Sequence, residues 1–292
     1  MKGFFCKAIF TLALLPLANS AFSFSWPLSD WNKTRSIFTF SQNRKGAYCQ
    51  SLLFEDAQNA VSADKGNVIA VITEKQGDGD WFESTLGNAL IISHDDSLIS
   101  VYGNLSEETA MDLTKKRVVG DEEELGKTGS SSWNESQEGG QLEFQIADRA
   151  SKTFINPIIL MPRNNKPPRL TLENLTIENQ FGRTYNLSSL RSIPAGVYKI
   201  YKKRQMDVNA YKSEVFVNGA ELEKITKEAV KCQDGTFLLL GSEAYASADF
   251  YPDENLELLG HILLPHGSDT ITIVVSDIFE NKATANFTLS AF

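Results

Sequence analysis

Three histidines are the residues of this chain best suited to metal or proton chemistry. They are His94, His261 and His266, and a site that uses several histidines would have to combine them. His261 and His266 stand five positions apart around Pro265, so strand geometry does not place them as a pair of metal ligands. His94 ends a β-branched run, and we expect it to have a structural or supporting role.

The composition is that of a globular protein with an acidic balance. The 292 residues include 42% hydrophobic and 22% charged residues, which excludes a disordered, collagenous or disulfide-scaffold protein. There are 28 Lys and Arg against 37 Asp and Glu, a formal net charge of −9. This balance argues against a nucleic-acid binder, since such proteins rely on clustered basic residues. The length accommodates one large or two modest domains.

Residues 1–20 have the pattern of a secretory signal peptide. Lys2 and Lys7 precede the apolar run 8–15, and small residues follow at 18–21. The apolar run is shorter than the roughly 20 residues that a membrane-spanning helix needs. We therefore expect an exported protein of the periplasm or cell envelope, with no membrane span in the mature chain.

The cysteines do not predict a disulfide framework. Cys6 leaves with the signal peptide, and Cys49 and Cys232 are far apart in the sequence. A bridge would require their Cα atoms to come within about 7 Å. Because the two cysteines fall in different expected domains, we do not expect them to be joined.

Strand patterns dominate the chain after residue 36. β-Branched and alternating runs separated by turn signals predict strands at 36–40, 67–74, 89–93, 98–102, 142–146, 170–177, 196–201, 215–217, 237–240, 261–264, 270–276 and 285–289. Helix-like spacing predicts helices over 106–116 and 219–231. The segment 161–168 contains three prolines and no apolar periodicity, which favours a domain boundary there.

Several short motifs of the first half occur in a characteristic order. Gly87-Asn88-Ala89-Leu90-Ile91-Ile92-Ser93-His94 and the run 98–105 are followed by the turn region 116–120, the runs 125–130 and 140–146, and Asn156-Pro157. Over residues 36–163 these motifs resemble the lysostaphin-type (LytM) zinc endopeptidase family, which cleaves peptidoglycan cross-bridges. The resemblance implies a mostly β fold with a LytM-type antiparallel sheet.

The same resemblance implies that the catalytic residues of the family are substituted. The family binds zinc through a His and an Asp four residues apart and through the second His of a His-x-His pair, and another His in an Ala-His-Leu segment assists. Here the His-x-His pair falls on Gln141 and Glu143, the assisting His on Asn104, and the His-to-Asp pair on Cys49 and Leu53. We therefore expect no catalytic residues and no zinc cofactor. Cys49, Asn104, Gln141 and Glu143 become candidate binding residues of one groove.

The second half has the pattern of an antiparallel β-sandwich. Its short strands are separated by frequent turn signals. The terminal hairpin over 267–289 resembles the closing hairpin of bacterial immunoglobulin-like domains. The expected organisation is thus a signal peptide (1–20), a short linker (21–35), a degenerate LytM-like domain (36–163) and an immunoglobulin-like sandwich (164–292).

The leading functional hypothesis is that the chain is an exported, catalytically inactive LytM-like protein with a binding or regulatory role in the cell envelope. Its expected partner is peptidoglycan or a cell-wall hydrolase such as an amidase, an implication of the resemblance alone. One alternative is an active zinc endopeptidase with an atypical site, for which Cys49, Glu55, Asp56 and Glu143 supply suitable ligand types. Another is a structural envelope protein that is held by its immunoglobulin-like half.

Overall fold

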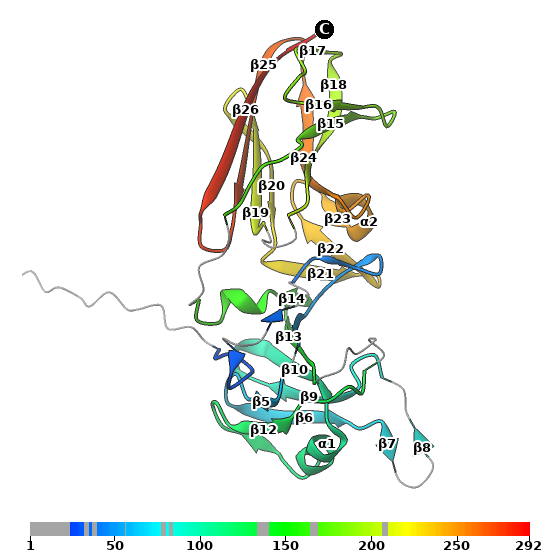
Figure 1. Ribbon diagram of the computed structural model, residues 1–292, viewed down its shortest axis with the longest axis vertical. Helices are drawn as coiled ribbons and strands as arrows, with labels where there is room; N and C mark the ends of the chain where they lie inside the picture. The colour runs from blue at the N-terminus through cyan, green and yellow to red at the C-terminus, as the bar shows by residue number, and fades with distance from the viewer. Residues whose placement is uncertain are drawn as a thin grey trace, which may run out of the picture.

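The chain consists of two parts stacked along the long axis of the molecule (Figure 1). The computed structural model describes residues 24–31, 35–36, 40–55, 57–76, 80–81, 84–132, 140–163, 169–205 and 210–292. The expected signal peptide and residues 164–168 of the proline-rich segment lie outside these ranges. The chain is mostly β, with an antiparallel sheet domain followed by a β-sandwich, so the predicted fold class is confirmed.

A large antiparallel sheet organises the first part. Its strands lie in the order β11 (Val118–Val119), β6 (Gly66–Ile72), β9 (Asn88–Ser93), β10 (Leu98–Leu105), β13 (Leu142–Asp148) and β14 (Thr153–Ile155). β4 (Leu52–Glu55) pairs with β13 and with β1 (Arg35–Ser36). Apolar side chains of β4, β9, β10 and β13 form one core, in which Leu90, Tyr102 and Phe144 are fully buried. The candidate site residues are carried by these central strands or by segments next to them.

Smaller elements surround this sheet. β12 (Glu124–Lys127) pairs with β5 (Asn59–Val61), and two hairpins are formed by β2 (Asn43–Arg44) with β3 (Ala47–Tyr48) and by β7 (Lys75–Gln76) with β8 (Asp80–Trp81). Two 3₁₀ turns, η2 (Asp95–Ser97) and η3 (Pro157–Ile159), connect strands.

The helix expected over 106–116 is present as α1 (Glu107–Leu113). The Ser106 hydroxyl accepts a hydrogen bond from the Thr109 N–H at 3.2 Å, which caps the helix start. α1 is short, and within the part of the chain that the structure describes no helix is long and apolar enough to cross a membrane.

Residues 24–31, which the sequence places in a linker, belong to the core of the first part. Phe24 and Leu28 are buried in it, and the N–H of Phe24 donates to the carbonyl of Leu160 at 3.1 Å. The Trp26 indole donates to the Pro162 carbonyl at 2.9 Å. This segment therefore ties the start of the described chain to the end of the first part.

The second part is a sandwich of two sheets. One sheet has the order β16 (Thr184–Asn186), β15 (Thr176–Asn179), β18 (Gly196–Lys203) and β24 (Leu256–Leu264). The other has the order β17 (Ser192–Ile193), β26 (Lys282–Ala291), β25 (Gly267–Ser276), β19 (Lys212–Val217) and β20 (Ala220–Thr226). Inward residues of both sheets, among them Ile200 and Ile273, form a second core.

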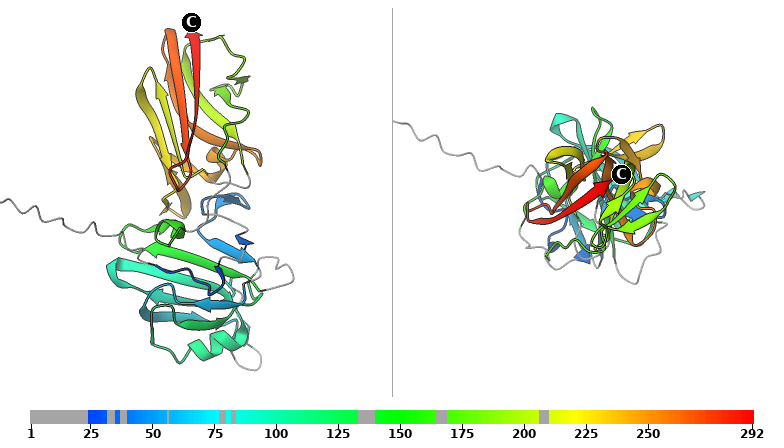
Figure 2. Two further views of the ribbon diagram at one scale, coloured as in Figure 1. Left: turned by 60° about the vertical axis from the view of Figure 1, so that its left-hand side comes forward. Right: turned by 90° about the horizontal axis from the view of Figure 1, so that it is seen from above.

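Strand pairing is continuous between the two parts. β14 pairs with β21 (Ala229–Gln233), which continues into β22 (Thr236–Leu240) and β23 (Ala244–Ala246) beside the one-turn helix α2 (Ser247–Phe250). A third core joins Phe40 and Tyr48 of the first part to residues of the second. The large sheet thus passes over the position of the expected boundary at 161–168. Figure 2 shows the two parts in contact along this junction.

The prediction of a helix over 219–231 is wrong, because this segment forms β20 and β21. In β20 the inward positions are Glu223 and Ile225, so burial alternates with a period of two. The Glu223 carboxylate accepts hydrogen bonds from the Ser242 N–H, the Ser242 hydroxyl and the Tyr245 hydroxyl. Glu223, which lies in the segment predicted as a helix, is therefore buried in a strand.

Candidate functional site

β13 carries the centre of the candidate site. Its even-numbered residues Leu142 and Phe144 face the core of the first part, whereas Glu143 lies on the opposite face. In the sheet, Glu143 lies between Leu53 of β4 and Gly103 of β10. The structure thus places Leu53, expected at a ligand position, directly beside Glu143.

The Glu143 carboxylate is held by several groups of the protein. Oε1 accepts hydrogen bonds from the Ser51 hydroxyl at 2.5 Å and from Nε2 of Gln145 at 3.1 Å. Oε2 lies 3.5 Å from Nη1 of Arg44, which β2 carries. Because the carboxylate is almost fully buried, the Arg44 guanidinium compensates a charge that would otherwise be costly.

Cys49 belongs to the same cluster as a buried thiol. Its Sγ lies 3.3 Å from the Ser51 carbonyl oxygen, to which the thiol donates. Burial raises the pKa of the Cys49 thiol, although nearby Arg44 opposes this effect. Cys49 and Cys232 are both free cysteines. The raised pKa of Cys49 disfavours the thiolate, which is the form that binds metals and attacks as a nucleophile.

Asn104 and Gln141 are joined by backbone and side-chain contacts next to this cluster. Nδ2 of Asn104 donates to the Gln141 carbonyl at 3.1 Å, and its Oδ1 accepts from the Ser132 N–H at 3.0 Å. Asn104 has a φ of 65° at a shift in the register between β10 and β9. Asparagine tolerates this left-handed conformation better than most residues, and such bulges redirect side chains near functional sites.

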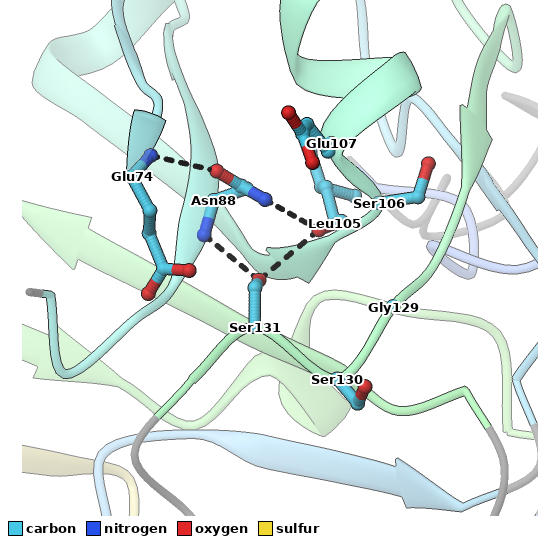
Figure 3. A pocket seen from close by; sticks show the side chains of 8 residues that line it. All are labelled: Glu74, Asn88, Leu105, Ser106, Glu107, Gly129, Ser130 and Ser131. Carbon is cyan, nitrogen blue, oxygen red and sulfur yellow. Dashed lines mark hydrogen bonds between the residues drawn. The ribbon is translucent and has the colours of Figure 1, made fainter. Parts of the chain in front are cut away.

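An open pocket of about 310 Å³ lies beside the Asn104–Gln141 pair (Figure 3). Its lining residues are Glu74, Asn88, Leu105, Ser106, Glu107, Gly129, Ser130 and Ser131. The Gly129 N–H donates to the Asn104 carbonyl at 2.6 Å, and the Gln141 N–H donates to the Gly129 carbonyl at 3.0 Å. The pocket wall is therefore continuous with the backbone of Asn104 and Gln141, although the four candidate residues themselves are buried.

Asn88 and Ser131 hold the pocket wall together, as Figure 3 shows. Asn88 accepts from the Glu74 N–H at 2.9 Å and donates to the Leu105 carbonyl at 3.2 Å. The Ser131 hydroxyl accepts from the Asn88 N–H at 2.9 Å and donates to the same Leu105 carbonyl at 3.1 Å. These bonds fix the positions of four chain segments around one opening.

The donor set at the candidate positions does not fit a catalytic zinc ion. Such an ion needs three protein ligands and an open position for water. Cys49 is a buried thiol whose pKa is raised by burial, Glu143 is paired with Arg44, and Leu53 has no donor atom. No group of three or more His, Cys, Asp or Glu residues that could hold a metal occurs among the residues described.

The histidines lie in separate surroundings. Nδ1 of His94 pairs with the Lys65 carbonyl at 2.8 Å and Nε2 pairs with the Ser100 hydroxyl at 2.7 Å, so both ring nitrogens are used within the first part. Nδ1 of His261 lies 3.4 Å from the Glu243 carboxylate in the second part. The contacts of His94 correspond to the structural role expected from the sequence.

Sequence reasoning missed Arg44, Ser51 and Gln145 as members of the Glu143 cluster. Gln145 could have been found, because residues two positions apart on a strand share a face. Ser51 lies two residues after the candidate Cys49, and this closeness in the sequence was a signal for it. Arg44 comes from a separate hairpin, whose placement depends on long-range packing that no local pattern reveals.

Comparison with known proteins gives limited matches. A protein-family model matches residues 169–292. No curated protein matches the chain.

Several solved structures are similar over parts of the chain. A structure of the SpoIIQ–SpoIIIAH pore-forming complex has 17% identity and a TM-score of 0.36, covering 49% of this chain and 92% of that one. A zinc-containing peptidase from Vibrio cholerae has 20% identity and a TM-score of 0.31, and the match covers 42% of this chain and 36% of that one. The solution structure of lysostaphin has 12% identity and a TM-score of 0.32, and the match covers 89% of this chain and 95% of that one. At these identities and TM-scores the matches carry no information about activity.

Proposed function

We propose that this chain is an exported, non-catalytic binding protein of the cell envelope that recognises peptidoglycan or a cell-wall hydrolase such as an amidase. The observation that carries the proposal is the Arg44–Glu143 ion pair at a position where the sequence resemblance expects a metal ligand. Asn104 and Gln141 stand where the family has histidines, and amides donate and accept hydrogen bonds without exchanging protons near neutral pH. Both side chains are buried, so their proposed contribution is to hold the pocket wall through bonds such as that from Asn104 to Gln141.

The pocket beside Asn104 and Gln141 supplies the proposed binding surface. Ser106, Ser130, Glu74 and Glu107 are among its lining residues, and the Ser106 hydroxyl is hydrogen-bonded to Thr109. This mixture of hydroxyl and carboxylate groups matches the amides and amines of a peptide. Its volume of about 310 Å³ lies at the lower end of the usual range for ligand pockets, so it suits a short portion of a peptide stem.

Retention on purified peptidoglycan sacculi tests this proposal. The mature chain is expected to co-sediment with sacculi. Ser130→Trp fills the pocket from an exposed position and should weaken retention about tenfold, which corresponds to about 1.4 kcal/mol. The matched control is Ser188→Trp, which makes the same change at an exposed turn of the second part and should be retained normally.

A second arm of the experiment separates the two partner classes. If sacculi do not retain the chain, a purified cell-wall amidase should be bound and its release of dye from labelled sacculi should increase. A chain that neither binds sacculi nor changes amidase activity would refute the proposal.

Elemental analysis distinguishes the proposal from the alternative of an active zinc endopeptidase. The purified mature chain is expected to contain far less than one zinc per molecule and to release no peptides from sacculi. Stoichiometric zinc together with cleavage of cross-links would overturn the non-catalytic assignment. In that case Cys49 and Glu143 would be the first residues to substitute.

A further inference from the structure

One edge of the sandwich in the second part is covered over only a fraction of its length. β26, drawn in red, runs the length of the sandwich (Figures 1 and 2). β17 pairs with it in parallel at Ser290 and Ala291 only. Among the residues that the structure describes, no strand pairs with the remainder of this edge of β26.

The backbone groups along the uncovered edge are arranged to pair with another strand. The Ser290 N–H points outward, since it donates to the Arg191 carbonyl at 2.9 Å. β26 is paired in continuous antiparallel register with β25, so every second residue has the same orientation as Ser290. The N–H and C=O groups of Thr284, Asn286 and Thr288 therefore face the open edge.

The inward side chains of β26 are also less buried along the part of the strand that does not pair with β17. The inward residues Leu289 and Ala291, near β17, are 2% and 4% exposed. The inward residues Ala283, Ala285 and Phe287 remain partly exposed, although they pack against the sandwich core. The core is therefore less completely covered where β17 does not extend.

A cavity of about 810 Å³ lies along this part of β26. It is bounded on one side by residues 169–172 and on the other by residues 282–285 and the turn before them. Arg169 and Lys282 are exposed and line it. Asp277 also lines it, but its carboxylate accepts hydrogen bonds from Phe279 and Asn281 within the turn. The exposed charges of the cavity are therefore positive.

We propose that the open edge of β26 binds an extended, acidic segment of a partner protein, which adds to the sheet as a strand. The segment continues the line of β17 in the same parallel direction and spans about seven residues beside Lys282–Thr288. Alternate apolar side chains cover Ala283, Ala285 and Phe287. An acidic residue at the N-terminal end of the segment meets Lys282 and Arg169.

A fluorescein-labelled peptide, Asp-Val-Thr-Val-Thr-Val-Thr, whose valines lie beside Ala283, Ala285 and Phe287 when its Asp lies beside Lys282, tests this inference by fluorescence polarisation with the mature chain. Saturable binding is expected. Asn286→Pro removes an outward N–H without interrupting the ladder with β25, and a proline of this orientation is tolerated on an edge strand. It should weaken binding about tenfold, whereas Asn286→Ala, which keeps the N–H, should bind within about twofold of the unchanged protein.

A charge exchange gives a test that does not depend on proline. Lys282→Glu should weaken binding of the peptide that begins with Asp and strengthen binding of the same peptide with Lys in that place. Circular dichroism and the melting temperature confirm that each variant folds. If Asn286→Pro fails to fold, the charge exchange decides the matter.

Three outcomes would overturn the inference. They are the absence of saturable binding at millimolar peptide, unchanged binding by Asn286→Pro together with no effect of the charge exchange, and a concentration-dependent dimer in analytical ultracentrifugation that Asn286→Pro abolishes. The last outcome would assign the edge to a second copy of this chain. Retention on sacculi is measured separately and tests the pocket of the first part, so failure of one proposal is distinguishable from failure of the other.

Discussion

Nη1 of Arg44 lies 3.5 Å from Oε2 of Glu143, which joins the hairpin of β2 and β3 to the centre of the large sheet. The same carboxylate accepts hydrogen bonds from Ser51 and Gln145 through its other oxygen. The negative charge of Glu143 is thus neutralised from within the chain. A metal ion at this position would have to compete with a guanidinium that is already in place.

Arg44→Met is expected to lower the free energy of unfolding by about 2 kcal/mol, because it leaves a buried carboxylate without its cation. This value lies below the usual cost of breaking a buried pair, since the Arg44 side chain is 19% exposed. Urea denaturation of the mature chain measures the change. The double variant Arg44→Met with Glu143→Gln should recover part of the loss. Strictly additive losses would show that the two side chains are not coupled.

The strands were the most predictable part of the fold. The run 270–276 alternates β-branched and polar residues, and β25 spans Gly267–Ser276. β21 was not predicted because it overlaps the segment predicted as a helix, and β23 has three residues, too few to show an alternating pattern. The three-to-four spacing of acidic, basic and apolar residues over 219–231 predicts a helix, but the segment forms β20 and β21. Glu223 is buried in β20 and accepts hydrogen bonds from Ser242, a long-range contact that the local spacing does not reveal.

The site was predictable only where a strand pattern carried it. Glu143 lies on β13 and Gln141 directly precedes that strand, and their positions follow from the motif order of the first half. The pairing of Arg44 with Glu143 depends on the hairpin of β2 and β3. That hairpin is placed by Tyr48, whose ring packs against residues of the second part more than 200 positions away. Such contacts leave no local signature in the sequence.

Glu257 should make stability fall in acid. Its carboxylate lies 2.8 Å from Nζ of Lys202 and 2.7 Å from Nζ of Lys227. Burial alone would raise the pKa of Glu257, but the ammonium groups of Lys227 and Lys202 outweigh it and hold the pKa at about 2, against an ordinary value of 4.5. Because the pKa of Glu257 is lower in the folded chain than in the unfolded chain, its ionised form stabilises the fold at pH values above the unfolded pKa. This contribution is lost as the pH falls from about 4.5 towards 2.

The expected contribution of Glu257 to this acid loss is about 3 kcal/mol. Urea unfolding at a series of pH values between 2 and 6, a range of about four units, measures it. Glu257→Gln is less stable at neutral pH, because two buried lysines lose their partner, but its stability should depend less on pH. Glu254→Gln, an exposed change nearby, should keep the original slope. Equal slopes for the original chain and Glu257→Gln would contradict the prediction.

The two parts are expected to unfold together, because they share a sheet and a core. Tyr48 is buried, contacts Phe250 and Tyr251, and donates a hydrogen bond to the Tyr245 carbonyl at 3.1 Å. Tyr48→Ala should cost about 3 to 5 kcal/mol and divide a single calorimetric transition into two. Tyr48→Phe removes only the hydroxyl and should cost about 1 kcal/mol while preserving the single transition. Two transitions in the unchanged chain would refute this coupling.

Substitutions at Asn104 separate backbone strain from hydrogen bonding beside the pocket. Asn104→Gly retains access to the φ of 65° but loses the bonds to Ser132 and Gln141. Asn104→Ala loses the same bonds and must also adopt a left-handed backbone, which costs roughly another 1 kcal/mol. Urea denaturation should therefore rank the original chain as most stable, then Asn104→Gly, then Asn104→Ala.

The same variants link the wall of the pocket to binding. Asn104 accepts the Gly129 N–H through its carbonyl, and Gly129 and Leu105 both line the pocket. A shift of the backbone at Asn104 should therefore displace the wall. Asn104→Ala is expected to weaken retention on sacculi more than Asn104→Gly does, at a temperature where both variants are folded. If Asn104→Ala is at least as stable as Asn104→Gly, the left-handed backbone is not a significant source of strain, and the choice of asparagine must instead rest on its two side-chain hydrogen bonds.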